Sequence, residues 1–243
     1  MNLDAAALAQ WFDGPLGRAL LEQEAEAVGQ ALECVFGVQC LQVGAWGGQP
    51  SAFLDLARTQ RRGLVSARAG VPASIRAQPS QLPIQSDSID ALLLPHTLEY
   101  EAHPHEVLRE AQRVLRPEGC LLVLGFEPLG SWALRSRLTR GGFPPGIARQ
   151  LSAGRLTDWL KLLGLDVDPA SRFLFSLPFA RAQSGRLRRW ADVTGPSLAS
   201  RLSGGYLLVA KKRVHAITPI RLQFRARPAV LGGFAEPTTR VGT

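Results

Sequence analysis

A run of glycines lies between an expected strand and an expected helix. The sequence Cys-Leu-Gln-Val-Gly-Ala-Trp-Gly-Gly-Gln-Pro at 40–50 is an apolar segment that ends in a glycine turn. Turns of this kind bring backbone N–H groups close to the polar groups of a nucleotide-type ligand. Two residues are unusual here, because Trp46 stands inside the turn and Gln42 stands where such sites often carry an acid. The stretch is a working cofactor turn with altered contacts, a turn for another ligand, or a relic of one.

The hydrophobic pattern around this turn predicts alternating strands and helices. The expected elements are, in order, a helical region at 8–33, a strand at 38–44, a helix at 51–58 with Ser51 as N-cap, strands at 62–67, 74–78 and 88–95, a helix at 103–115, a turn at 116–119, a strand at 120–126, a helix at 155–167, and strands at 171–178 and 204–213. Alternation of this kind predicts a doubly wound α/β sheet with parallel strands. The last two strands, separated by a long loop, predict an antiparallel pair at one edge.

Several short motifs in the middle of the chain occur in a characteristic order. They are Leu82-Pro83, Ile89-Asp90, Leu98-Glu99 and the run Arg-Val-Leu-Arg-Pro at 113–117. In order and spacing they resemble the core of class I S-adenosylmethionine-dependent methyltransferases of the methyltransferase type 11 group. The resemblance extends over about residues 36–213. It implies a Rossmann-like, seven-stranded, mostly parallel sheet with an antiparallel edge strand.

The resemblance also implies S-adenosylmethionine as cofactor, bound at the C-terminal ends of the first strands, where open α/β sheets form a crevice. Family members commonly use three acids there, in the first strand for the amino end, after the second strand for the ribose, and after the third strand for the adenine. This chain has Gln42, Ser-Ala-Arg at 66–68, and Gln78 at those places. The expected cofactor-binding residues are Gln42, Gly44, Ala45, Trp46, Gly48, Ala67, Gln78, Leu82 and His96.

These departures have a predictable physical effect. A carboxylate that holds ribose hydroxyls makes charge-assisted hydrogen bonds of about 1.5–3 kcal/mol, against roughly 1 kcal/mol for neutral ones. Its loss weakens binding by about one to two decades. Trp46 can either stack on the ligand or fill the place where the ligand would sit. The site therefore either binds the cofactor through altered contacts or has another use.

His96 directly follows an expected buried strand at the mouth of the crevice, and it is the candidate for a general base or a substrate contact. Its alternative role is to cap the local backbone. Glu99 matches a family position that serves the local turn, so a structural role is expected. Methyl transfer is a direct displacement that depends mainly on alignment and exclusion of water, so no catalytic dyad is required. His103 and His105 lack an evident third ligand, so no metal site is predicted.

The charge of the chain is unevenly distributed. Residues 1–134 hold 9 Arg against 15 Asp and Glu, a net charge of −6, whereas residues 135–210 carry +8 and residues 211–243 carry +6. A basic face can hold nucleic acid or another anionic partner. Two functions are therefore compared: a methyltransferase that acts on a small-molecule acceptor, and a non-catalytic protein of the same fold that binds an anionic partner such as RNA.

Composition favours a cytoplasmic protein. The three cysteines, Cys34, Cys40 and Cys120, are an odd number without paired spacing, which favours reduced and buried thiols. No apolar run reaches the roughly 18 residues that a membrane helix needs, and the first residues lack a secretion-signal pattern. The expected parts are a helical N-terminal extension at 1–35, a methyltransferase-like domain at 36–214, and a basic tail with little order at 215–243.

Overall fold

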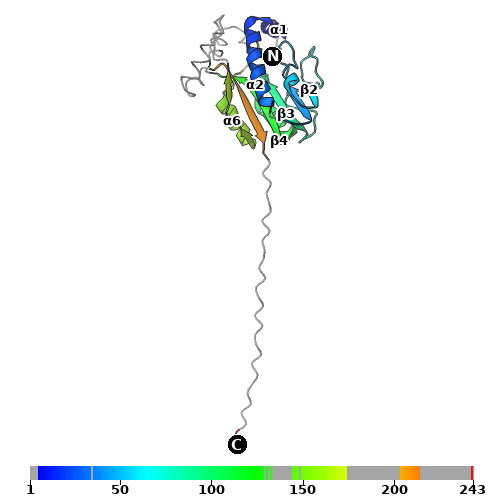
Figure 1. The fold of residues 1–243 in the computed structure, drawn as a ribbon, viewed down its shortest axis with the longest axis vertical. Coiled ribbons are helices and arrows are strands. Elements are labelled where there is room, and N and C mark those ends of the chain that lie inside the picture. Colours follow the sequence, from blue (N-terminus) through cyan, green and yellow to red (C-terminus); the bar gives the residue numbers. More distant parts are fainter. Residues whose placement is uncertain are drawn as a thin grey trace.

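A mixed sheet of seven strands organises the described part of the molecule. The computed structural model describes residues 5–33, 35–128, 130, 132, 144–147, 149–173, 203–213 and 242. The strand order is β2 (Arg61–Val65), β1 (Gln39–Val43), β3 (Ile89–Pro95), β4 (Leu115–Phe126), β7 (Gly205–Lys212) and β5 (Leu165–Val167), with β6 (Ser171–Phe173) also paired to β7. The first four are mutually parallel, whereas β7 runs antiparallel to its three neighbours. This confirms the predicted sheet with an antiparallel edge (Figure 1).

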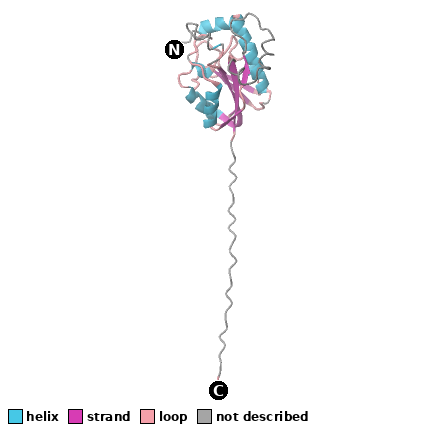
Figure 2. Ribbon diagram, turned by 90° about the vertical axis from the view of Figure 1, so that its left-hand side faces the viewer, coloured by secondary structure: helices cyan, strands magenta, loops and turns pink. Residues whose placement is uncertain are grey.

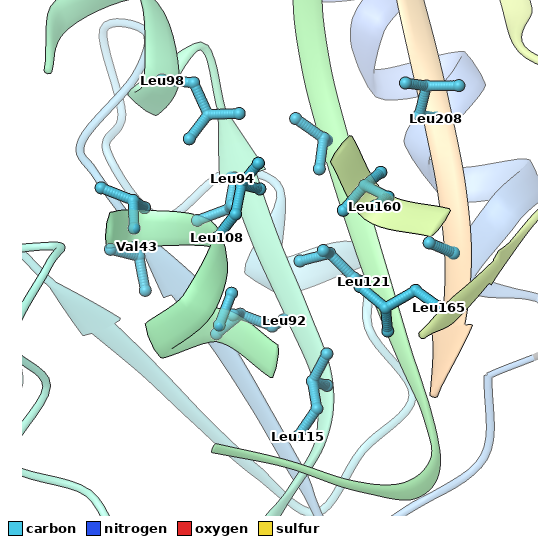
Figure 3. Packing of buried hydrophobic residues seen from close by; sticks show 14 of the residues in the cluster. Val43, Leu92, Leu94, Leu98, Leu108, Leu115, Leu121, Leu160, Leu165 and Leu208 are labelled. Carbon is cyan, nitrogen blue, oxygen red and sulfur yellow. The ribbon is translucent and has the colours of Figure 1, made fainter. Parts of the chain in front are cut away.

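One face of the sheet is covered by α4 (Pro104–Val114) and α6 (Ala153–Leu162). The apolar stripe of α4 packs on the fully buried strand β3, and together they bury a cluster of leucines and valines between helix and sheet (Figure 3). Leu92, Leu108 and Leu121 are completely enclosed there. Burying each such side chain contributes about 1.5–3 kcal/mol relative to exposure. The β3–α4–β4 crossover is thus the most strongly packed unit.

The opposite face carries two N-terminal helices, α1 (Ala5–Asp13) and α2 (Pro15–Leu32), so helices lie on both sides of the strands (Figure 2). Leu20, Val28 and Leu32 of α2 are buried against the sheet. The region expected to be helical therefore consists of two helices that meet at Gly14. A short helix, α3 (Thr97–Tyr100), follows β3. Among the described residues, no helix is long and apolar enough to cross a membrane.

Two expected elements are wrong. The helix predicted at 51–58 is only a single 3-10 turn, η1 (Leu54–Leu56), because the segment is short, lies beside Pro50 and closes with i→i+3 bonds, as in Ala57 N–H to Leu54 O at 3.1 Å. The strand predicted at 74–78 is reduced to the single bridges Val65↔Ile75 and Gln78↔Gln81. Prolines 72 and 79 flank it and cannot donate to a ladder.

The ends of other elements also differ from expectation. The turn predicted at 116–119 is an irregular start of β4, with Glu118 at a φ of 64°. The helix predicted at 155–167 stops at Leu162, because Gly164 takes a φ of 79° and the chain enters β5. Of the strand predicted at 171–178 only β6 lies within the described residues. The expected tail lies outside them apart from Gly242.

Asp90, which matches the aspartate of the family motif, holds the start of the sheet together. Its Oδ2 accepts hydrogen bonds from the N–H groups of Val38 and Gln39 at 2.9 and 2.8 Å, and its Oδ1 pairs with Arg116. Burial alone would raise the pKa of Asp90, but Arg116 and the two N–H donors lower it. This residue is structural and lies at the opposite end of the strands from the glycine turn.

Candidate cofactor site

The glycine turn begins directly after β1, and its first residue must be glycine for two reasons. Gly44 has a φ of 95°, a conformation that residues with a Cβ rarely adopt. A Cβ at this position would also lie 2.5 Å from Oγ1 of Thr97, whose hydroxyl donates to Val43 O. The loop after β3 therefore packs closely on the turn. Gly48, by contrast, has open space around it.

Replacing Gly44 by alanine is expected to lower the free energy of unfolding by about 2–4 kcal/mol, because positive φ costs about 1–2 kcal/mol and the new methyl group clashes with Thr97. Urea denaturation followed by circular dichroism measures this. Gly48→Ala is the matched control and should change the free energy by less than about 1 kcal/mol. Equal losses for the two variants would show that the turn is not constrained as described.

Trp46 folds underneath the turn and is only 2% exposed. Its indole N–H donates to Glu24 Oε2 of α2 at 2.7 Å. One indole face stacks on the ring of His96 with a centroid separation of 4.3 Å, and Phe12 contacts it edge-on at 4.8 Å. The side chain thus anchors the middle of the turn to α2 and to the loop after β3.

His96 is completely buried, and carboxylates contact both of its ring nitrogens. Nε2 lies 2.7 Å from Glu24 Oε1, and Nδ1 lies 2.7 Å from Glu99 Oε2. Burial alone would lower the pKa of His96, but the two carboxylates raise it to about 9. At neutral pH the ring is therefore an imidazolium with both N–H groups engaged. Such a ring cannot accept a proton, so the geometry favours a positioning role for His96.

Glu24, Trp46, His96 and Glu99 form what we call the buried cluster. Glu99 is anchored from a third side, because its Oε1 accepts the N–H of Phe126 at 2.8 Å. Burial raises the pKa of Glu99, against the opposing effects of His96 and of the Phe126 N–H. The buried cluster joins α2, the glycine turn, α3 and the end of β4.

Gln42 closes the glycine turn from inside. Its Nε2 donates to Gly44 O at 2.9 Å and to Pro50 O at 2.7 Å, which ties the two ends of the turn together. Its Oε1 is buried and has no hydrogen-bond partner among the described residues. The backbone N–H groups of residues 45–49 likewise donate to no other group in the part of the chain that the structure describes. The turn therefore combines unused donors with one unused acceptor.

The segment after β2, where the family usually has a ribose-binding acid, carries the positively charged Arg68 instead. Three residues after the strand, the guanidinium of Arg68 lies 5.4 Å from the ring centroid of Tyr100. Because β2 and β3 flank β1, this contact crosses the C-terminal end of β1. Burial lowers the pKa of Arg68, and the nearby Tyr100 and half-buried Glu101 oppose that effect. A cation thus stands where the family usually has an acid.

The structure brings together only part of the predicted site. Gln42, Gly44, Ala45, Trp46 and Gly48 form one turn, and His96 stacks beside it. Ala67 and Gln78 are exposed on the β2 side.

Leu82 is buried on the opposite face of the sheet, where its N–H donates to Glu110 Oε1 of α4 at 2.8 Å.

Glu24 was not among the site residues predicted from the sequence. A signal was present, because Glu24 interrupts the buried stripe of Leu20 and Val28 at helical spacing.

A cavity of about 540 Å³ opens between the N-terminal helices and the turn. Phe12, Leu21, Trp46 and Phe53 give it apolar walls, and the charged residues Asp13, Arg18 and Glu22 line it as well. Among the described residues, no group of His, Cys, Asp and Glu could hold a metal ion.

Comparison with known proteins identifies the family and the fold. The model of a family described as a methyltransferase domain matches residues 49–123. The uncharacterized protein YafS of Escherichia coli K12 is 32% identical over 164 residues, which cover 67% of each chain. The uncharacterized protein Rv2003c of Mycobacterium tuberculosis H37Rv is 32% identical over 173 residues, 68% of this chain and 59% of the relative. The chain thus spans about two thirds of the first relative and less of the second.

Solved structures share the fold at low identity. A S-adenosylmethionine-dependent methyltransferase from Archaeoglobus fulgidus aligns with a TM-score of 0.60 at 15% identity, over 84% of this chain and 97% of that one. The [4+2]-cyclase SpnF aligns with a TM-score of 0.54 at 20% identity, over 79% and 81%. From the family model, the relatives and this fold, the chain belongs to the class I S-adenosylmethionine-dependent methyltransferase family. SpnF illustrates that the fold alone does not fix the reaction.

Proposed function

We propose that this protein is a S-adenosylmethionine-dependent methyltransferase that binds its cofactor at the glycine turn and acts on a small-molecule acceptor in the cytoplasm. The observation that carries the proposal is the pairing of unused donors at residues 45–49 with the unused acceptor Gln42 Oε1. When bound, the cofactor supplies a methyl group activated by its sulfonium. Cys40 and Cys120 are buried free thiols, which agrees with a reducing compartment.

The methionyl end of the cofactor carries a carboxylate and an ammonium group. Consecutive backbone N–H groups around a positive-φ glycine suit a carboxylate, and Gly47 supplies such a conformation with a φ of 85°. An ammonium donor would satisfy Gln42 Oε1, which otherwise carries the cost of a buried unpaired acceptor, about 1–3 kcal/mol. Because Gln42 is fully buried, that contact requires a small shift of the turn.

The ribose end has a different set of side chains from the rest of the family. Ala67 and Gln78 provide no carboxylate, while Glu101, which follows α3, interacts electrostatically with Arg68. Burial raises the pKa of Glu101, and Arg68 opposes that effect. We propose Glu101 as the group that receives the ribose hydroxyls. Because burial disfavours the ionised form of Glu101, binding is weaker than with an exposed carboxylate.

The acceptor fits the cavity beside the turn. Its volume of about 540 Å³ lies in the range of small-molecule sites, roughly 300–1,000 Å³. The lining favours an acceptor with an apolar body and a polar group that can reach Asp13, Arg18 or Glu22. Holding acceptor and donor side by side, and keeping water out, is the main contribution that a direct displacement needs from the protein.

Isothermal titration with S-adenosylmethionine and S-adenosylhomocysteine tests the proposal, after removal of any ligand that co-purifies. We expect binding in the micromolar range. Gln42→Leu should weaken it by about tenfold, because the variant loses both the acceptor and the closure of the turn. Gln30→Leu is the matched control and should bind like the unaltered protein, because Gln30 is an exposed residue of α2. The absence of heat at millimolar ligand would overturn the proposal.

That negative result would favour the second candidate, a non-catalytic protein that binds an anionic partner such as RNA. The observation behind it is the missing carboxylates at Ala67 and Gln78, together with the net charge of +8 over residues 135–210. Arginines 135, 137 and 140 lie outside the described residues. This candidate predicts RNA association that weakens steeply with salt.

A further inference from the structure

We propose that Glu24 is a positioning residue of the cofactor site, through which helix α2 fixes the shape of the glycine turn. The inference rests on the proposed function, because it assigns to the turn the binding of the cofactor's methionyl end. Glu24 belongs to the helical N-terminal extension and is 72 positions from His96 and 22 from Trp46. The extension is therefore part of the site rather than an appendage to it.

The two oxygens of one carboxylate are divided between the two loops that form the crevice. Oε2 accepts the indole N–H of Trp46, and Oε1 pairs with Nε2 of His96, both at 2.7 Å. The side chains of Glu24 and His96 have no exposed surface. Burying a charged group costs several kcal/mol unless partners satisfy it, and here each oxygen has one. A charge so placed specifies one arrangement of the turn relative to the loop after β3.

The turn has few other restraints. At its ends, the amide of Gln42 connects Gly44 O to Pro50 O. In its middle, the N–H groups of residues 45–49 make no hydrogen bond within the part of the chain that the structure describes. The side chain of Trp46 is thus the anchor of the middle, and Glu24 and His96 hold that anchor. Donors that are held in place before the ligand arrives give higher affinity than donors that must be ordered.

Two variants test whether the hydrogen bonds of Glu24 hold the turn. Glu24→Gln keeps these hydrogen bonds, whereas Glu24→Ala removes them. Glutamine can still accept the Trp46 N–H with Oε1 and can donate its amide to a neutral His96 ring, whose Nδ1–H remains on Glu99. We expect the affinity for S-adenosylhomocysteine to stay within about threefold for Glu24→Gln and to fall at least tenfold for Glu24→Ala. If Glu24→Ala does not fold, Trp46→Phe carries the test. It keeps the Glu24–His96 pair, loses the indole hydrogen bond and some ring packing, and should also lose affinity.

Two controls distinguish positioning from general destabilisation. Val28→Ala lies one turn along the same buried stripe of α2 and removes packing without touching the turn, so it should bind like the unaltered protein. The indole N–H resonance of Trp46, assigned by its absence in Trp46→Phe, reports on the anchor without any ligand. It should stay in place in Glu24→Gln and Val28→Ala and move in Glu24→Ala.

The outcomes are separable. Equal loss of affinity in Val28→Ala and Glu24→Ala, or an unmoved indole resonance in Glu24→Ala, would overturn the positioning role. If the unaltered protein binds no S-adenosylhomocysteine while the indole and the amides of residues 45–49 move in Glu24→Ala, the proposed function fails and Glu24 still positions the turn.

Discussion

Replacing Glu24 by alanine is expected to lower the free energy of unfolding by about 3–5 kcal/mol, the cost of removing one partner from a buried ion pair. The variant leaves the His96 imidazolium facing a single carboxylate and leaves the Trp46 indole N–H without its acceptor. An orphaned buried donor alone costs about 1–3 kcal/mol. The loss approaches the whole stability of many domains of this size.

Chemical denaturation with urea, followed by circular dichroism, measures this loss. Glu22→Ala is the control, because Glu22 lies on the same helix but is exposed. It should change the free energy by no more than about 0.5 kcal/mol. Similar values for the two variants would mean that the buried cluster contributes no more than a surface charge.

The stability of the protein is expected to fall as pH rises through the titration of His96. The folded pKa of about 9 lies above the unfolded value of about 6.5. A raised pKa of this kind stabilises the protein fully below about pH 6.5, and the contribution is lost between there and about pH 9. At about 1.4 kcal/mol for each tenfold change, the difference between the two pKa values corresponds to roughly 3–4 kcal/mol.

The groups that face the His96 ring come from several elements. Glu24 lies on α2, Glu99 on α3, Trp46 on the turn, and Phe126 at the end of β4, where its ring stacks on His96. Burial raises the pKa of Glu99, so ionisation of this carboxyl also costs stability as pH rises. Burial also raises the pKa of Tyr100. The expected loss of stability between about pH 6.5 and 9 therefore belongs to His96 together with Glu99.

The free energy of unfolding, measured from pH 6 to 10 for the unaltered protein and for Glu24→Gln, isolates this contribution. Other titrating groups are common to both proteins and cancel in the difference. Removing one of the two carboxylates lowers the pKa of His96, so the variant should show a shallower fall. If the free energy of unfolding fell with pH at the same slope in both proteins, Glu24 would not be raising the pKa of His96.

The sequence was sufficient for elements whose stability is local or strongly periodic. The strand β3 and the helix α4 agree with the prediction to within one residue, because α4 has a clear apolar stripe and β3 is a continuous apolar run. The segment at 51–58 is also rich in helix-forming residues but forms only η1. Eight residues after a proline make too few helical hydrogen bonds to offset the cost of helix nucleation.

The environment of the site could be predicted less well, because it depends on contacts between distant segments. His96 was identified from its place after β3, yet its protonation state is set by Glu24, 72 positions away. Trp46 looked like either a ligand contact or a filler, and its indole N–H bond to α2 decides where the ring lies. The contact between Arg68 and Tyr100 arises in the same way, from the order of the strands.

The most direct test of the central claim is a titration of the ¹⁵N-labelled full chain with S-adenosylhomocysteine, followed by amide spectroscopy. If the cofactor binds at the glycine turn, the largest shifts occur at the backbone amides of residues 45–49 and at the side-chain amide of Gln42. A smaller change is expected at the Trp46 indole. An absence of shifts at millimolar ligand, or shifts confined to residues outside the glycine turn, would contradict it.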